Sequence, residues 1–348
     1  MVATDIRFRL SAPPVSGVVS PRSVLVFLVL AGLAFGMFCL SMTLGDYPLG
    51  MGQVLAALVS SGDYYDQVVV YDWRMPRALA GLLVGIAFGM SGALFQTITR
   101  NPLASPDVIG ISAGATTAVV GGIVLGIGAG LGTQTLGLVG ALLAALAIYL
   151  LAWKRGTTGY RIVLVGIGVS WLCTSATGYL LAKAKLHEAQ QVVGWMVGNL
   201  NNVTWGHTTP LLISMAVLVP IAVVLSGWLR TLHLGDDIAV GLGTPVQLAR
   251  LVLLLVGVGL VAFATAAAGP VAFVALAAPQ IARRLAGRPA PPLLASACTG
   301  AVVVLGSDLL VRVLLPGTQL PVGVITGILG APFLLWLLTR ANRAGSGG

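Results

Sequence analysis

The side chains of this chain that could do chemistry are charged residues at the ends of apolar stretches. Arg74 and Arg77 flank Pro76 before one such stretch, and Asp308 precedes Arg312 by four residues near the end of another. A spacing of four puts Asp308 and Arg312 on one face of a helix, where they can form an ion pair. Arginines at a helix start are unfavourable because the helix dipole is positive there. We therefore expect an anion, either a lipid phosphate or a protein carboxylate, to compensate Arg74 and Arg77.

Residues typical of catalysis and metal binding are scattered along the sequence. The three histidines lack the spacing of metal ligands, and the three cysteines fall in separate apolar stretches where burial as small hydrophobic residues is expected: His187, His207, His233, Cys39, Cys173 and Cys298. The sequence contains no GxxxxGK(S/T) phosphate loop, no GxSxG elbow and no HExxH helix. We predict no metal site, no disulfide, no cofactor and no enzymatic activity.

The composition predicts a membrane protein. Hydrophobic residues make up 57% of the 348 residues and charged residues 8%, against about 25% charged residues in an ordinary soluble domain. A membrane-spanning helix needs about 20 apolar residues, and the chain has room for about ten such helices. We predict an all-α, polytopic domain with spans at residues 24–40, 78–98, 108–128, 132–153, 162–182, 208–229, 251–268, 270–282, 293–315 and 322–339.

The seventh and eighth spans are the ambiguous part of this assignment. Residues 251–282 contain no charge and are too long for one helix yet short for two. We place a break at Gly269 and Pro270, because proline removes a hydrogen bond in a helix interior and clashes with the preceding turn. A single kinked span is the alternative, and it would reverse the orientation of everything downstream.

The distribution of basic residues fixes the expected orientation. With ten spans and a cytosolic N-terminus, fourteen basic residues lie inside: Arg7, Arg9, Arg22, Arg100, Lys154, Arg155, Arg161, Arg230, Arg250, Arg283, Arg284, Arg288, Arg340 and Arg343. Five lie outside: Arg74, Arg77, Lys183, Lys185 and Arg312. This is the positive-inside pattern. It accounts for the net charge of +9, and no basic stripe interleaved with aromatic residues points to nucleic acid.

The predicted domain organisation is simple. The apolar run after Arg22 is followed by no convincing signal-peptide cleavage site, so it is expected to be kept as the first span. Residues 1–23 and 341–348 are expected to be cytosolic tails around one transmembrane domain, residues 24–340. Only Asp308 among the acidic residues lies well within a span. Because ion-coupled carriers use titratable groups there, the driving energy is expected to come from another polypeptide.

Residues 230–250 form the most patterned cytosolic segment. Asp236 and Asp237 can cap a short helix, Gly241 and Gly243 can make a sharp turn, and Pro245 can open a second helix. The pattern predicts a helix-turn-helix on the membrane surface. An ordinary capped loop between spans is compatible with the same residues.

A glycine pattern leads into a recognisable block. Gly81, Gly85 and Gly89 recur every four residues, with Gly92 just beyond, which leaves one helix face bare for a neighbouring helix. The block WRMPRALAGLLVGIAFGMSGALFQTITRNPLASPDVIGISAGA contains this pattern, and GPVAFVALAAPQIARRLAG, SDLLVR and LPVGVITGILGAPFLLWLL follow near the C-terminus. These sequences resemble the FecCD/BtuC-type permeases, the membrane subunits of ABC importers for iron-siderophores, haem and cobalamin.

The resemblance implies a type II ABC importer fold, a bacterial cytoplasmic-membrane location and three kinds of protein partner. A second permease subunit and two ATPase subunits would complete the transporter, and an extracytoplasmic binding protein would deliver the cargo. By resemblance, Arg74, Arg77 and Arg312 would face acidic residues of that binding protein. The residues of the LGxxxAxxLG pattern would couple to the ATPase: Leu234, Gly235, Ala239, Leu242 and Gly243.

The translocation path and the cargo are the remaining expectations. The second, fifth, eighth and tenth spans line the pore in the resembling family, and Ser91, Gln96 and Asn101 are polar candidates for it here, although each could equally bond another helix or cap a turn. Ala275 and Gln280 depart from the common glycine and histidine of the family and resemble ferric-enterobactin-type permeases. We therefore expect a ferric siderophore, with a cobalamin or haem permease and an ion-coupled secondary transporter as the alternatives.

Overall fold

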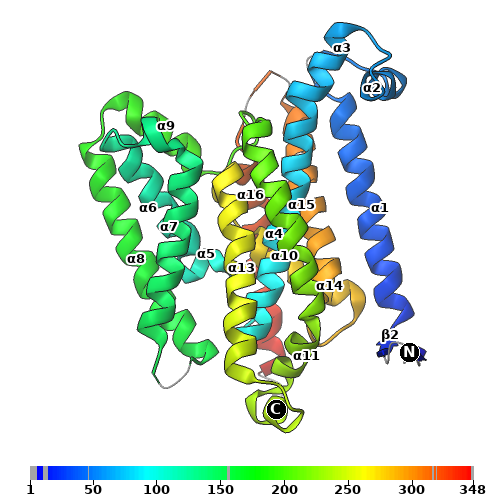
Figure 1. Cartoon of the computed structure of the whole chain (residues 1–348), viewed down its shortest axis with the longest axis vertical. Coiled ribbons are helices and arrows are strands. Elements are labelled where there is room, and N and C mark those ends of the chain that lie inside the picture. Colours follow the sequence, from blue (N-terminus) through cyan, green and yellow to red (C-terminus); the bar gives the residue numbers. More distant parts are fainter. Residues whose placement is uncertain are drawn as a thin grey trace.

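The structure, a computed structural model, describes residues 6–10, 15–45, 47–154, 157–315, 317–318 and 320–345, and these are mostly helical (Figure 1). Strands β1 (Ile6–Leu10) and β2 (Val15–Val19) form a small antiparallel hairpin, which the sequence analysis did not predict. The next elements along the chain are α1 (Pro21–Thr43), α2 (Met51–Leu58), α3 (Tyr64–Val68), the π-helical turn η1 (Val69–Arg74), α4 (Met75–Thr99), α5 (Pro106–Ile109), α6 (Ile111–Val124) and α7 (Gly128–Ala152).

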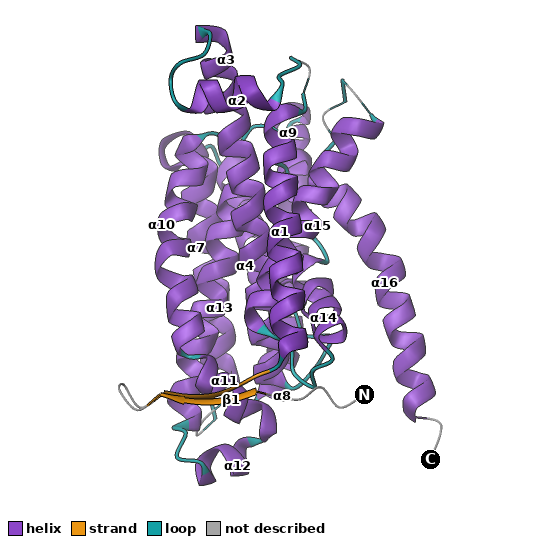
Figure 2. Cartoon of the chain, turned by 90° about the vertical axis from the view of Figure 1, so that its right-hand side faces the viewer, coloured by secondary structure: helices purple, strands orange, loops and turns teal. Residues whose placement is uncertain are grey.

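The rest of the chain supplies nine further helices among the described residues. They are α8 (Gly159–Lys183), α9 (Leu186–Met196), α10 (Trp205–Val224), α11 (Ser226–Leu234), α12 (Asp236–Gly241), α13 (Val246–Ala268), α14 (Val274–Ala286), α15 (Leu293–Leu314) and α16 (Val322–Gly345). The hairpin β1–β2 and α12 lie at one end of the molecule, and α2 and α3 lie at the other (Figure 2). This placement agrees with a shared cytosolic side for the N-terminal region and residues 230–250.

The ten predicted spans each coincide with a helix. Within the described residues, seven helical stretches are long and apolar enough to cross a membrane, ending at Thr43, Thr99, Ala152, Lys183, Val224, Ala268 and Leu314. Two shorter apolar helices, Ile111–Val124 and Val322–Trp336, correspond to the third and tenth predicted spans. The eighth is the short helix α14. The prediction of a polytopic α-helical membrane fold is thus confirmed.

The break between the seventh and eighth spans is also where the sequence predicted it. Helix α13 ends at Ala268, and α14 begins at Val274. Gly269 adopts a φ of 74°, a left-handed value that glycine tolerates without strain. A single kinked span is therefore excluded, and the downstream orientation follows the ten-segment arrangement. Some predicted positions, namely residues 1–5, 11–14, 346–348 and Arg155, lie outside the described residues.

Helix α4 occupies the centre of the larger of two helix groups and packs against α13, α14 and α15 (Figure 1). Its glycine face is used for close approach, as predicted. A Cβ atom on Gly85 would lie 2.5 Å from the backbone of Ala301 in α15, and one on Gly81 would lie 3.2 Å from the side chain of Leu305. Since lipid tails are as apolar as leucine, helices in a membrane associate through such packing rather than through a hydrophobic driving force.

The smaller group consists of α6, α7, α8 and α9, with α5 wedged against α8 (Figure 1). Glycine again permits the contacts, because a Cβ atom on Gly166 of α8 would lie 2.6 Å from the carbonyl oxygen of Ile109 in α5. Large apolar side chains cover the outward faces of α1, α7 and α8, including Phe35 at 67%, Leu143 at 60% and Trp171 at 69% exposure. Such a surface suits lipid rather than water as its solvent.

The Gly85 contact yields a stability prediction. Replacing Gly85 with alanine should lower the free energy of unfolding by about 1–3 kcal/mol, because the methyl group overlaps the Ala301 backbone and α4 and α15 must separate. Unfolding of the purified chain in detergent micelles by increasing SDS measures this loss.

Gly36→Ala in α1 is the matched control. Nothing lies within 4 Å of the position that its Cβ atom would take, so alanine there should leave stability unchanged or raise it by up to about 1 kcal/mol through helix propensity. Equal behaviour of the two variants would contradict the packing role of the α4 glycine face.

Candidate docking and coupling sites

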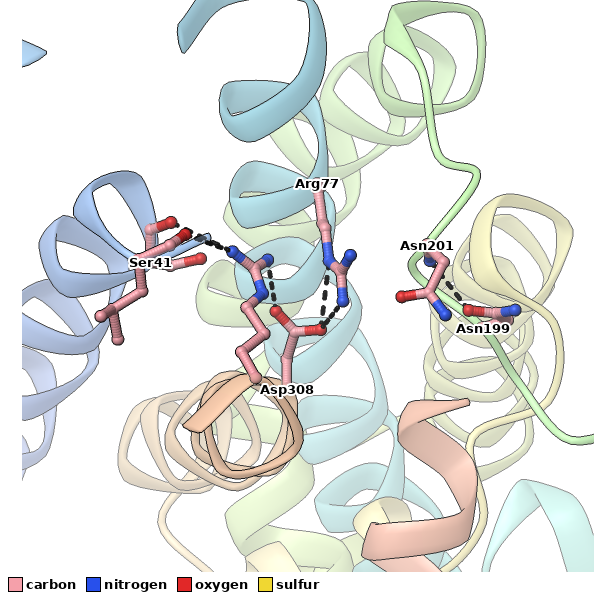
Figure 3. Close-up of polar contacts among 7 residues, drawn as sticks. Ser41, Arg77, Asn199, Asn201 and Asp308 are labelled. Atoms are coloured by element: carbon pink, nitrogen blue, oxygen red, sulfur yellow. Dashed lines mark hydrogen bonds and ion pairs between the residues drawn. The ribbon is translucent and has the colours of Figure 1, made fainter. Parts of the chain in front are cut away.

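A buried carboxylate joins two arginines at the end of the molecule that carries α2 and α3. Asp308 of α15 is 3% exposed. Its Oδ1 accepts from Arg77 Nε at 3.2 Å and Nη2 at 2.7 Å, and its Oδ2 accepts from Arg312 Nη2 at 2.6 Å (Figure 3). The predicted pair of Asp308 and Arg312 is confirmed. The contact with Arg77, 231 residues away in sequence, was not predicted.

Arg312 and Arg74 both donate hydrogen bonds to the C-terminal end of α1. Arg312 donates to the carbonyl oxygens of Ser41 and Leu44 at 3.2 and 3.3 Å. Arg74 donates to those of Met42 and Thr43 at 2.8 and 3.0 Å. The last carbonyls of a helix lack partners within it and carry the negative end of its dipole, so guanidinium groups are favourable there. The compensating partners of the arginines at the start of α4 are therefore groups of this chain.

The three arginines predicted to contact a binding protein are thus brought together but largely enclosed. Arg74 is 6% exposed as a residue, and the side chains of Arg77 and Arg312 are 21% and 12% exposed. Arg77 presents the most accessible guanidinium of the three. Docking of a partner at these residues stays a prediction.

The segment of residues 230–250 folds as the predicted helix-turn-helix at the opposite end. Helix α12 begins at Asp236 and ends at Gly241, and Pro245 directly precedes α13. Gly235 and Gly243 have φ values of 115° and 78°, which let the chain reverse at both ends of α12. Of the predicted coupling residues, Leu234 and Leu242 are 55% and 61% exposed, and Ala239 is fully buried.

Sequence reasoning missed two members of this surface. Ile238 and Val240 are 53% and 63% exposed beside Leu234 and Leu242, so four large apolar side chains gather on the α11–α12 tip, a set that we call the tip patch. An apolar patch at the cytosolic end, away from the lipid-facing helices, is typical of a protein contact surface. The alternation of large apolar residues with alanine and glycine in DDIAVGLG could have indicated it.

Asp236 connects this tip to the rest of the fold. Its two carboxylate oxygens accept from Arg250 Nη2 at 2.9 Å each, and Oδ1 also accepts from Arg100 Nη2 at 3.2 Å. Arg250 is 1% exposed and also donates to the carbonyl oxygen of Thr157. Arg100 directly follows α4, Arg250 lies in α13 and Thr157 precedes α8. The sequence suggested a helix cap for Asp236, whereas the structure makes it an ionic junction of α12, α13 and the end of α4.

The polar candidates for the translocation path form internal bonds in this structure. Ser91 Oγ donates to the carbonyl oxygen of Gly257 at 2.7 Å, and Gln96 Nε2 donates to that of Leu276 at 3.1 Å. Gln280 Nε2 in turn donates to Gln96 Oε1. Asn101 Oδ1 accepts from Leu103 N at 2.9 Å within the turn after α4. A pore role of Ser91, Gln96 and Asn101 remains a prediction.

A polar cavity of about 340 Å³ opens near the end of the molecule that carries Arg77. Its lining includes the amides of Gln190, Gln191, Asn199 and Asn202, and Asn199 accepts from the backbone of Asn201 at 2.8 Å (Figure 3). Among the residues that the structure describes, no group of three histidine, cysteine, aspartate or glutamate side chains is placed to hold a metal ion.

A charge-poor helical bundle whose described ion pairs lie near its two ends, with an apolar tip protruding from one of them, has the architecture of a polytopic membrane protein with a contact surface for a partner. The sequence profile of the FecCD transport family matches residues 28–340. The ferric enterobactin permease protein FepG of Escherichia coli (strain K12) is 41% identical over 86% of this chain and 91% of its own length. The iron(3+)-hydroxamate permease protein FhuG of Bacillus subtilis (strain 168) is 36% identical over 88% and 94%.

A solved structure supports the same assignment. A metal-chelate type ABC transporter in an inward-facing conformation superposes with a TM-score of 0.80 at 25% identity, over 90% of this chain and 99% of that one. The chain therefore belongs to the FecCD transport family. It is a permease subunit of an ABC importer in the cytoplasmic membrane, not an enzyme.

The Asp308 junction generates a second stability prediction. Asp308→Asn should lower the free energy of unfolding by on the order of 3 kcal/mol, because two poorly solvated arginines lose their shared carboxylate. Asp72→Asn, at an exposed position close in sequence to Arg77, should change stability by no more than about 0.5 kcal/mol. Thermal unfolding of both variants in detergent measures the difference, and a small loss for Asp308→Asn would mean that the junction contributes little.

Proposed function

We propose that this permease imports a ferric siderophore, working with a second permease subunit, two ATPase subunits and an extracytoplasmic binding protein. The observation that carries the proposal is the tip patch on α11–α12, which is exposed at one end and joined by Asp236 to α4 and α13. A permease without a phosphate loop needs such a surface to receive energy from a separate ATPase.

Coupling would use Leu234, Gly235, Ala239, Leu242 and Gly243 in different ways. Leu234 and Leu242 would insert into a cleft of the ATPase as apolar anchors, since central buried anchors dominate binding energy at protein interfaces. Ala239 packs against the body of the permease, and the two glycines permit the chain reversals that present the tip. Movement of the tip would then be transmitted through Asp236.

Docking of the binding protein would use Arg74, Arg77 and Arg312 as an electropositive end. Because Asp308 neutralises only part of this charge, an incoming carboxylate would meet Arg77 first, the more exposed member of the two ion pairs. Surface charge pairs contribute mainly to orientation and encounter rate. The amide-lined cavity that includes Asn199 would then receive the cargo from the binding protein.

The path across the membrane would follow the polar residues of α4 and α14. Gln96 and Gln280 bond each other between these helices, and Ser91 bonds α13. Opening a passage beside α4 would exchange these internal bonds for bonds to water or cargo. Ser91, Gln96 and, at the cytosolic end, Asn101 would then line the route.

The cargo proposal rests on residues and relatives together. Ala275 and Gln280 resemble the ferric-enterobactin type, and FepG is named for that siderophore. FhuG, named for iron(3+)-hydroxamate, is only five percentage points less identical, from 41% to 36%. A bulky ferric catecholate is therefore our first candidate, with hydroxamate, cobalamin and haem as alternatives. The chelator would carry the iron, so the permease needs no metal ligands of its own.

An ion-coupled secondary transporter is the alternative of another class. Such carriers place titratable groups within their spans, and the one acidic residue well within a predicted span, Asp308, forms ion pairs with two arginines. A carboxylate held in this way is poorly suited to bind and release a coupling ion.

Reconstituted transport tests the proposal. Proteoliposomes with the permease, its ATPase and its binding protein should take up iron-55 labelled ferric enterobactin only when all three proteins and ATP are present. Changing Leu234 and Leu242 together to aspartate should lower uptake at least about tenfold, because apolar interface anchors contribute about 2 kcal/mol or more each. Leu55→Asp in the exposed face of α2, at the other end, is the matched control.

Competition with unlabelled cargo separates the alternatives. Excess ferric enterobactin should abolish uptake, and ferric hydroxamate or cobalamin should not. Uptake by the permease alone down an ion gradient would contradict the ABC mechanism, whereas uptake of ferric hydroxamate alone would refute only the catecholate assignment.

Asp236 provides a prediction about coupling. Asp236→Asn should leave Arg250 buried without a charge partner and loosen α12 from α4, so uptake should fall at least fivefold while the ATPase still copurifies with the permease. Asp237→Asn, at the adjacent exposed position, should transport normally. Uptake at the wild-type rate in Asp236→Asn would show that the junction does not transmit movement.

A further inference from the structure

An apolar crevice runs along the seam between the two helix groups. It has a volume of about 260 Å³ and lies between α7 and α13. Its floor consists of buried side chains from four other elements: Phe95 of α4, Ile109 of α5, Ile111 of α6 and Ile162 of α8, each no more than 3% exposed.

The crevice opens to the lipid-facing surface. Leu142 and Leu146 of α7 and Leu255 of α13 form its rim and are 46%, 52% and 59% exposed. Water has few polar partners on these walls, so it would be a poor occupant. A void left empty forfeits the dispersion contacts of its lining. A flexible hydrocarbon chain entering from the bilayer would restore them.

The depth of the crevice matches the cytosolic leaflet. Its α7 wall, residues 142–149, ends three residues before Ala152, where α7 ends on the side of the molecule assigned to the cytosol. At 1.5 Å per residue this wall lies about 5–15 Å from the helix end. One leaflet of the hydrocarbon core is about 15 Å thick, so an acyl chain of that leaflet is within reach.

The cytosolic mouth of the crevice carries aromatic and basic groups. Tyr149 lines the crevice, and its ring lies 5.5 Å from that of Trp153, which is 51% exposed. Lys154 is exposed next to Trp153, and Arg161 Nη1 donates to the Lys154 carbonyl oxygen at 3.3 Å. No acidic side chain in the described part of the chain forms an ion pair with Lys154 or Arg161.

We propose that this seam is a binding site for an anionic phospholipid, with one acyl chain in the crevice and the phosphate headgroup between Lys154 and Arg161. Tyr149 and Trp153 would sit at headgroup level, as aromatic side chains do at membrane interfaces. An acyl chain is equally well solvated by bulk lipid, so the hydrophobic effect adds little to its binding free energy. The crevice therefore selects acyl chains by their shape. The two basic side chains therefore decide which headgroup binds, and the inference needs only that the chain spans a membrane.

Native mass spectrometry of the full chain in detergent micelles tests the site, with phosphatidylglycerol as the anionic probe and phosphatidylcholine as the zwitterionic one. Phosphatidylglycerol should bind more tightly. Lys154→Ala and Arg161→Ala should each weaken it about fivefold, the effect of one basic residue near a membrane surface, and leave phosphatidylcholine unchanged. Lys183→Ala, at the other end of α8 over the Tyr179 ring, is the matched control and should have no effect.

A second variant separates the acyl chain from the headgroup. Leu146→Trp at the exposed rim should fill the crevice without disturbing buried packing, and it should weaken phosphatidylglycerol binding while both basic residues remain. The proposal would be overturned if the two lipids bound with equal affinity. It would also be overturned if Lys183→Ala weakened phosphatidylglycerol binding as much as Lys154→Ala or Arg161→Ala, or if Leu146→Trp had no effect. Equally tight binding of glycerol 3-phosphate, which has no acyl chain, would overturn it too, as would a dimer in which lipid binding is lost because a second copy covers the seam.

Discussion

The structure depends on the bare glycine face of α4. In a bilayer the hydrophobic effect does not drive helices together, so their association must be stabilised by close packing. The Gly85 position brings α4 into backbone contact with Ala301 of α15, and Gly92 does the same with Ala275 of α14. Helix α4 is consequently the most enclosed of the long helices, and the other helices of the larger group are arranged around it.

This central helix ends at an ionic junction on each side. Arg77 lies in its first turn and bonds Asp308, and Arg100 directly follows its last turn and bonds Asp236. Each aspartate also bonds a second arginine, Arg312 or Arg250. The two junctions use the same chemistry, a carboxylate shared by two guanidinium groups from distant segments. The charges of these two junctions therefore lie near the ends of α4, away from its apolar middle.

Much of this architecture is readable from the sequence, because its signals are local. Span positions follow from runs of apolar residues, the glycine face from a four-residue repeat, and the break at Pro270 from backbone chemistry. The pair of Asp308 and Arg312 follows from helical spacing alone. What escaped prediction depends on contacts between segments far apart, such as Arg77 with Asp308 or Gln96 with Gln280, because no spacing rule fixes which distant side chains meet. The N-terminal hairpin escaped for a different reason, since its short strands lie in a stretch that resembles a tail.

The same geometry explains how events at the two ends can be linked. Helix α4 has 25 residues and is therefore about 37 Å long, enough to cross the bilayer as one continuous rod. Under the proposed coupling, a displacement of α12 would act on the end of this rod through Asp236, and a displacement at the other end would act through Asp308. Since α4 also contacts α13, α14 and α15 through nearly incompressible packing, it cannot shift without moving its neighbours. The smaller helix group contacts α13 through α6 and α7, and the crevice between α7 and α13 has an apolar lining.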